Sequence, residues 1–122
     1  MTEAPYDIIM SGPITGVPDY KERFAIAHVL ARQEFRTAKG REANVFNPAM
    51  MEDGRAYLWY MRQCVNAILD SPSATLVQLD GWQDSKGARA EYALCVSIGM
   101  VIRDTSKSSA LTGAREIDKS TT

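Results

Sequence analysis

The chain has few of the residues that build metal centres, disulfide frameworks or histidine-based active sites. Its 122 residues include two cysteines, Cys64 and Cys95, and one histidine, His28. The cysteines form no CxxC pair and have no histidine close by in sequence, so we expect two reduced, mostly buried thiols. His28 lies within a stretch of helical periodicity and is expected to be structural. The sequence predicts no metal site and no cofactor.

Long apolar runs and an excess of one charge are missing as well. No segment approaches the roughly 20 apolar residues that span a bilayer, and the first residues lack the basic and apolar regions of a signal peptide. A formal net charge of -1 gives no field that would attract a nucleic acid polymer or an anionic membrane. We therefore expect a cytoplasmic protein that binds neither DNA, RNA nor a membrane.

The composition is that of one ordinary globular domain. Hydrophobic residues make up 45% of the chain and charged residues 24%, which is typical of soluble domains large enough for one modest core. We place that domain at residues 1–104. Residues 105–122 are polar and without sustained periodicity, so we expect a mobile tail, which can also order on a neighbouring subunit.

Short apolar runs alternate with amphipathic stretches along the domain. We expect strands at 6–10, 44–46, 74–79 and 100–103, and helices at 20–37, 57–69 and 88–99. Asp19 is predicted to cap the first helix, and Gly99 to end the third. This alternation implies parallel pairing with right-handed crossovers. The predicted fold is α/β, a three-layer Rossmann-like sandwich with a parallel sheet of four to five strands.

Two loops follow strands at what should be the same edge of the sheet. In an open parallel sheet, ligands bind beyond the carboxyl ends of the strands. The first loop is SGPITG, in which Ser11 and Gly12 let the backbone approach a ligand, Thr15 adds a hydroxyl and Pro13 stiffens the turn. The alternative is that such a turn serves only to reverse the chain.

The second loop, DGWQDSKGA, runs into the third helix. Ser85, Gly87 and Ala88 stand where that helix begins, so free backbone amides and the positive end of the helix dipole can bind an anion such as phosphate. The alternative for Ser85 is a helix cap without any ligand. Trp82 can be a stacking wall for a base or only an anchor of the loop.

A carboxylate follows one helical turn later. Glu91 comes four residues after Gly87 and projects from the same face, so it can overlook the pocket about a sugar's distance from the phosphate site. The alternative is a glutamate exposed on the helix surface. Three aromatic side chains can line a base pocket or pack between helix and sheet: Tyr20, Tyr57 and Tyr60.

Several stretches between residues 8 and 103 resemble the small phage and bacterial proteins of the DUF4406 type. They are IIMSGPITG, DYKERF, NPA, YMRQ and LVQLDGWQDSKGARAEYALCVSIG, and the most specific motif is GWxxSxGAxxE. The resemblance extends to the nucleoside 2-deoxyribosyltransferase-like superfamily, which includes deoxyribosyltransferases and nucleoside 5′-monophosphate N-glycosidases. It implies a Rossmann-like sandwich that forms a homo-oligomer, a dimer or larger, and binds a small-molecule nucleotide.

The resemblance also implies roles for individual residues. Glu91 matches the glutamate that attacks the anomeric carbon of the sugar. The segment that holds the 5′-phosphate is matched by Ser85, Gly87 and Ala88. The loop that faces base and sugar is matched by Ser11, Gly12, Pro13 and Thr15, and Arg23 matches an arginine that can reach the ligand.

One position departs from the family pattern. Many relatives have an aspartate in the second helix where this chain has Cys64, and a thiol is a poor substitute for an acid that assists a leaving base. Asp80 and Asp84 are alternative acids. The sequence therefore predicts hydrolysis of the N-glycosidic bond of a nucleoside or deoxynucleoside 5′-monophosphate. Deoxyribosyl transfer between bases and non-catalytic nucleotide binding, which Cys64 favours, are the alternative hypotheses.

Overall fold

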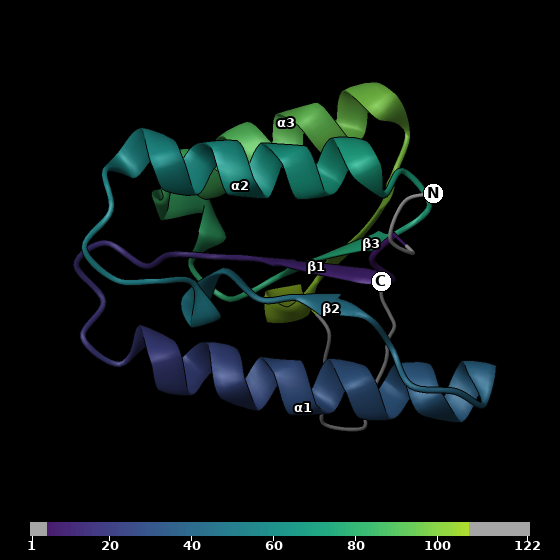
Figure 1. Cartoon of the computed structure of the whole chain (residues 1–122). Coiled ribbons are helices and arrows are strands. Elements are labelled where there is room, and N and C mark those ends of the chain that lie inside the picture. The colour runs from purple at the N-terminus through teal and green to yellow at the C-terminus, as the bar shows by residue number, and fades with distance from the viewer. Residues whose placement is uncertain (1–4, 108–122) are drawn as a thin grey trace.

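The computed structural model describes residues 5–107 and consists of three layers. A sheet lies in the middle, with one helix on one face and two helices on the other (Figure 1). The strands are β1 (Ile8–Ser11), β2 (Val45–Phe46), β3 (Thr75–Gln78) and β4 (Val101–Asp104), and the helices are α1 (Tyr20–Lys39), α2 (Tyr57–Asp70) and α3 (Lys86–Ile98). The predicted α/β sandwich is confirmed, with strand and helix ends shifted by one or two residues.

The topology explains why the helices divide between the two faces. All neighbouring strands are parallel, in the order β2-β1-β3-β4. The chain moves outward from β1 to β2 through α1, then crosses back to β3 and on to β4 through α2 and α3. Because right-handed crossovers in opposite directions fall on opposite faces, α1 lies alone below the sheet. The order reverses between β1 and β3, which is where an open α/β sheet binds ligands.

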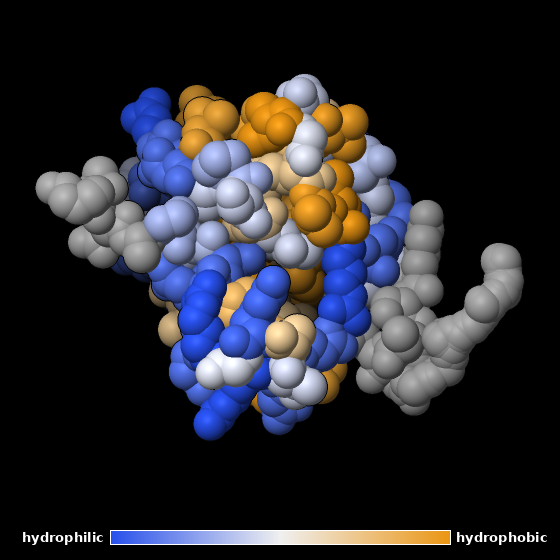
Figure 2. Space-filling model, turned by 90° about the vertical axis from the view of Figure 1, so that its right-hand side faces the viewer, coloured by the Kyte–Doolittle hydropathy of each residue, from blue (hydrophilic) through white to orange (hydrophobic). Residues whose placement is uncertain are grey.

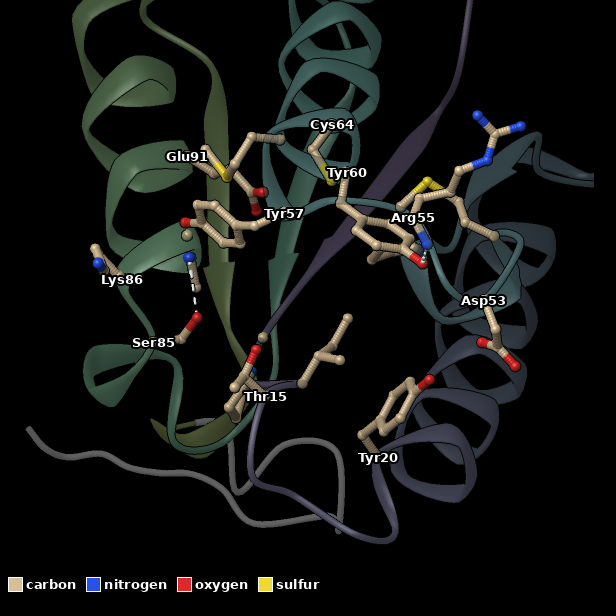
Figure 3. Close-up of a pocket in the computed structure, with 18 of the residues that line it drawn as sticks. Thr15, Tyr20, Asp53, Arg55, Tyr57, Tyr60, Cys64, Ser85, Lys86 and Glu91 are labelled. Carbon is tan, nitrogen blue, oxygen red and sulfur yellow. Dashed lines mark hydrogen bonds between the residues drawn. The ribbon is translucent and has the colours of Figure 1, made fainter.

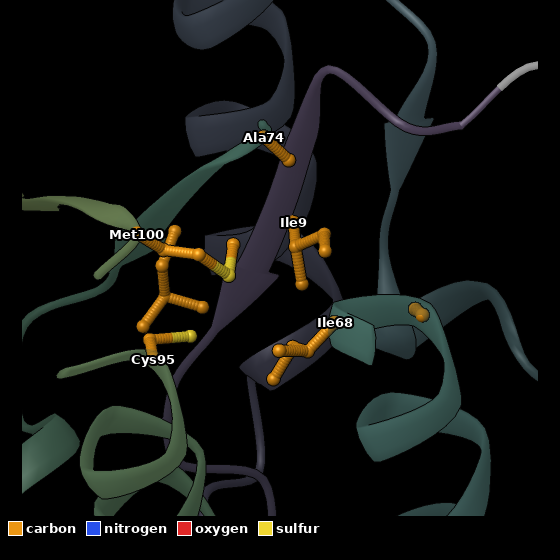
Figure 4. Close-up of a cluster of buried hydrophobic side chains, with 7 residues drawn as sticks. Ile9, Ile68, Ala74, Cys95 and Met100 are labelled. Carbon is orange, nitrogen blue, oxygen red and sulfur yellow. The ribbon is translucent and has the colours of Figure 1, made fainter. Parts of the chain in front are cut away.

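Alternation along the strands divides the core in two. Ile9 and Leu76 point toward α2 and α3, where they pack with Ile68, Cys95 and Met100 (Figure 4). Neighbouring strand residues point toward α1, where the cluster consists of Ile8, Met10, Phe24, Ala31, Val77 and Leu79. The same alternation sends the last residues of β1 and β3 toward the layer of α2 and α3.

Both helix-end predictions can be compared with the structure. Gly99 ends α3 with φ 78° and donates its backbone N–H to Val96 O at 3.2 Å, so the predicted stop is confirmed. Asp19 precedes α1 but makes no side-chain capping bond, and that prediction is wrong. Its backbone is not in the extended conformation of a capping residue, and its Oδ1 instead accepts a bond from Arg23 Nε at 3.0 Å.

Surface polarity differs between the layers. Figure 2 views the edge of the sheet at which the strands begin, and apolar side chains gather over α2 and α3 whereas the α1 side is mainly hydrophilic. Leu69, Ile98 and Val101 are among the exposed apolar residues. No helix within residues 5–107 is long and apolar enough to cross a membrane.

Two further predictions concern single segments. His28 is half-buried in α1, with Nδ1 3.0 Å from Asn47 Nδ2, as fits a structural role.

The predicted tail covers residues 105–122, and its part beyond Lys107 lies outside the described residues. Thr105–Lys107 form a short 3-10 turn, in which Thr105 Oγ1 donates to Gln78 O at 2.7 Å.

Candidate functional site

A cavity of about 730 Å³ opens at the edge where the strands end. Its walls come from the loop after β1, the segment before α2, the first two turns of α2 and the amino end of α3 (Figure 3). Its size is within the range of small-molecule pockets. The two loops that the sequence placed at one edge of the sheet thus form one site.

Glu91 lies at this cavity and is only 6% exposed, so the interpretation as a surface glutamate is wrong. Ser11 Oγ donates to Glu91 Oε1 at 2.5 Å, from a residue 80 positions away in the chain. The thiol of Cys64, on the facing helix, also hydrogen-bonds this carboxyl group. Donors from β1 and α2 therefore hold the carboxyl group that α3 supplies.

Burial dominates the electrostatics around Glu91. It raises the pKa of Glu91 above the usual 4.5, while the hydrogen bonds from Ser11 and Cys64 act in the opposite direction. Burial and then the neighbouring Glu91 also raise the pKa of Cys64, and the same two causes raise the pKa of Cys95 to about 11. Both buried cysteines are therefore neutral thiols at physiological pH.

The amino end of α3 forms another wall. Ser85 Oγ accepts the backbone N–H of Ala88 at 3.1 Å, so Ser85 does cap the helix. Ser85 also lines the cavity, and its hydroxyl group can still donate a hydrogen bond to a ligand there. Lys86 adds a cation beside the helix dipole, and both favour an anion at this end.

Two glycines permit the close packing of the site. A Cβ on Gly12 would lie 2.8 Å from Leu79 Cβ, too close for the loop to keep its place over the end of β3. A Cβ on Gly87 would lie 3.2 Å from Met61 Sδ and 3.3 Å from Tyr57 Oη. Glycine at position 87 therefore lets α3 begin beside the side chains of α2.

If the cavity binds the nucleoside monophosphate that the sequence predicts, Gly87→Val is expected to weaken that binding by at least about tenfold, because the added methyl groups enter the cavity and push Tyr57 and Met61 aside. Isothermal titration calorimetry measures the change. Ala93→Val places the same side chain on an exposed position of α3 and is the matched control. Equal affinities for the two variants would contradict the placement of the ligand.

The cavity contains most of the residues singled out from the sequence. Those that line it are Gly12, Pro13, Thr15, Ser85, Gly87, Ala88 and Glu91, together with Tyr20, Tyr57, Tyr60 and Asp84. Ser11 contributes through its bond to Glu91. The three tyrosines thus line the cavity, and Tyr20 also packs against the core cluster on the α1 side of the sheet, so both interpretations apply to it.

Three candidate residues lie elsewhere. Arg23 pairs with Asp19 and lines a separate groove of about 370 Å³ beside α1, as does Asp80. Trp82 donates from Nε1 to Asp104 Oδ2 at 3.0 Å and packs on Tyr92, with 4.8 Å between ring centroids. These contacts favour the interpretation of Trp82 as a loop anchor.

Sequence reasoning missed the segment before α2. Asp53, Gly54 and Arg55 line the cavity, and Asp53 is tied to α1 by Lys21 Nζ at 3.2 Å. Tyr60 Oη, on α2, fixes the same segment by donating a hydrogen bond to Glu52 O at 2.6 Å. The available signal was β2, since any segment that follows a parallel strand begins at the ligand-binding edge.

Fold and site together define a Rossmann-like α/β protein with a buried carboxyl group facing a cavity at the switch point of its sheet. The chain belongs to the DUF4406 family, a domain of unknown function, whose model matches residues 6–104. The resemblance to this family is thus confirmed. Comparison with curated proteins and with solved structures gave no match.

Proposed function

We propose that this protein hydrolyses the N-glycosidic bond of a nucleoside or deoxynucleoside 5′-monophosphate, with Glu91 as the nucleophile. The observation that carries the proposal is the position of Glu91, buried at a cavity whose wall includes the amino end of its own helix. The resemblance to the nucleoside 2-deoxyribosyltransferase-like superfamily supports the same role.

The reaction takes two steps. A Glu91 carboxylate oxygen bonds to C1′ of the sugar as the C1′–N bond breaks, and the base leaves with the electron pair and takes up a proton. Water then attacks C1′, the glutamate leaves, and the products are free base and sugar 5-phosphate. Ser11, which donates to Glu91 Oε1 at 2.5 Å, keeps the carboxylate oriented in both steps.

The shape of the cavity supports one orientation of the nucleotide. Figure 3 shows Ser85 and Lys86 on one side of Glu91, and Tyr20 and Asp53 on the other. The phosphate belongs at the first end, where the amides of α3 and a cation favour an anion. The base belongs among the tyrosines. Of the two alternative acids, Asp84 lines this cavity, next to Ser85, and Asp80 does not.

A panel of nucleoside 5′-monophosphates tests the proposal by chromatographic detection of free base. The unphosphorylated nucleosides are matched controls, and their turnover should be slower because they lack the group that α3 recognises. Product formation only after addition of an acceptor base would instead identify deoxyribosyl transfer. No release from any member of the panel would overturn the proposed hydrolysis.

The rate of base release is expected to rise with pH through a pKa higher than that of an ordinary carboxyl group. Burial raises the pKa of Glu91 above 4.5, and only its ionised form attacks C1′. The acidic limb of a kcat/KM profile measured between about pH 4 and pH 8 gives this value for the free protein. A limb at the usual glutamate pKa would show that Glu91 is not the titrating nucleophile.

A specific observation favours a second function. Cys64 stands beside Glu91 as a neutral thiol, and burial favours the protonated, non-nucleophilic form of that glutamate. Such a site can bind and sequester a nucleotide without cleaving it. Saturable calorimetric binding of a monophosphate that is recovered intact would identify this function. The expected homo-oligomer stays a prediction, which the mass of the particle in solution tests.

A further inference from the structure

Gln78 is a fully buried polar side chain. It is the last residue of β3 and is 0% exposed. Within the part of the chain that the structure describes, neither Gln78 Nε2 nor Gln78 Oε1 has a hydrogen-bond partner. Buried amides without partners destabilise a fold, so an apolar residue of similar volume would suit this position better if packing alone decided it.

The sheet places Gln78 beside the group that holds the nucleophile. Gln78 pairs in register with Ser11 on one side and with Asp104 on the other. Strand alternation points Gln78 to the same face as Leu76, which packs beneath α2 and α3. Ser11 points to this face too, since its Oγ bonds Glu91 on α3. The amide of Gln78 thus emerges one strand away from the contact between Ser11 and Glu91.

Among residues 5–107, the groups that shift the pKa of Glu91 carry no charge, although Arg55 and Lys86 line the same cavity. β1 presents the hydroxyl of Ser11, α2 presents the thiol of Cys64, and α3 itself carries Cys95 one turn further on. From β4, Asp104 is engaged with Trp82. A carboxylate accepts up to about four hydrogen bonds, so the donors in contact with Glu91 leave its capacity unfilled.

We propose that Gln78 is a positioning residue, whose side-chain amide donates a hydrogen bond to the carboxylate of Glu91 when that group is ionised. A change of rotamer brings the amide to Glu91 from the neighbouring strand. Among the described residues the amide has no other partner, so it is available for this bond. This inference rests on the proposed function, because an ionised Glu91 is what the attack on C1′ requires.

The experiment compares wild type with Gln78→Met, which keeps the volume and removes the amide. The pKa of Glu91 is measured by NMR titration of protein labelled with ¹³C at the glutamate carboxyl carbon, with Glu91→Gln to assign the signal. The pKa is expected to rise by about one unit in Gln78→Met. For base release, kcat measured at pH values below the pKa of Glu91 is expected to fall about tenfold with KM unchanged.

Two controls separate this effect from packing. Gln33→Met makes the same change at an exposed position of α1 and should leave the Glu91 titration unchanged. Thermal unfolding of Gln78→Met is expected at the wild-type temperature or above, since an unpartnered amide has been removed. If Gln78→Met does not fold, Gln78→Leu takes its place in every measurement.

An unchanged or lowered pKa of Glu91 in the folded Gln78 variant would overturn the proposal. The titration needs no turnover, so it decides the role of Gln78 even for a protein that only binds nucleotides. Absence of base release from wild type would refute the proposed function alone. A wild-type protein that releases base, with a variant of equal kcat and equal Glu91 titration, would refute the role of Gln78 alone.

Discussion

Glu91→Gln is expected to lower the rate of base release by at least about a thousandfold. A carboxamide has nearly the same shape and its oxygen can still accept the hydrogen bond from Ser11 Oγ, so the loss reflects the missing nucleophile rather than a disturbed site. Single-turnover chromatography with a monophosphate substrate measures the rate. Because the cavity is retained, nucleotide affinity should stay within a few-fold of wild type.

The same substitution is expected to stabilise the fold at neutral pH. The folded-state pKa of Glu91 lies above its ordinary value of 4.5, so the folded protein loses stability as pH rises from the ordinary value through the raised one. Glutamine does not ionise and avoids this loss. The melting temperature of Glu91→Gln should therefore exceed that of wild type at pH 7, and the difference should shrink as pH falls toward the ordinary carboxyl pKa.

Glu22→Gln is the matched control, since it makes the same change on the exposed surface of α1. It should alter neither base release nor the pH dependence of unfolding. Retention of full activity by Glu91→Gln would rule out Glu91 as nucleophile. A lower melting temperature for Glu91→Gln at pH 7 would show that Glu91 is ionised and well stabilised in the folded state.

Cys64→Asp is expected to raise the rate of base release by about a hundredfold, the size of a general-acid contribution. Cys64 hydrogen-bonds Glu91, so an aspartate there would form a buried pair of carboxyl groups. Two such groups share one proton, which leaves one ionised and the other protonated near neutral pH. The first can attack C1′ while the second protonates the leaving base.

Cys64→Asn is the control that distinguishes the effect of an acidic group at position 64 from the effect of a changed side-chain shape. It has the size of aspartate and can donate a hydrogen bond, but it cannot deliver a proton to the base. Equal rates for the two variants would contradict the assignment of a missing acid at position 64. If Cys64→Asp only lowers the melting temperature without a gain in rate, Cys64 acts as a core residue and its match to the family aspartate is wrong.

Features set by neighbouring residues followed from the sequence. The apolar periodicity of α1, α2 and α3, the left-handed glycine at position 99 and the serine cap at position 85 each depend on a few consecutive residues. The parallel sheet followed from the alternation of these segments. Convergence of the loops after β1 and β3 then followed from the geometry of any parallel sheet.

The burial and orientation of the candidate side chains could not be predicted from the sequence. The spacing of Gly87 and Glu91 fits an exposed glutamate as well as a buried one, and the 6% exposure of Glu91 depends on Ser11 and Cys64, which other elements supply. Arg23 and Trp82 lie outside the cavity, where Arg23 donates to Asp19 and Trp82 donates to Asp104. The burial and orientation of these side chains therefore depend on residues that are distant in the sequence.

The sequence by itself determined the class of fold, the edge at which a ligand would bind and the helix that would carry the carboxyl group, since each is encoded in short-range pattern and chain handedness. Only the tertiary structure decided that Glu91 is buried, that Ser11 holds it from 80 residues away, and that the Gln78 side chain, next to Ser11 in the sheet, has no hydrogen-bond partner among residues 5–107. Solvation and hydrogen bonding of these groups depend on packing between layers, where the contacting residues are distant in the chain.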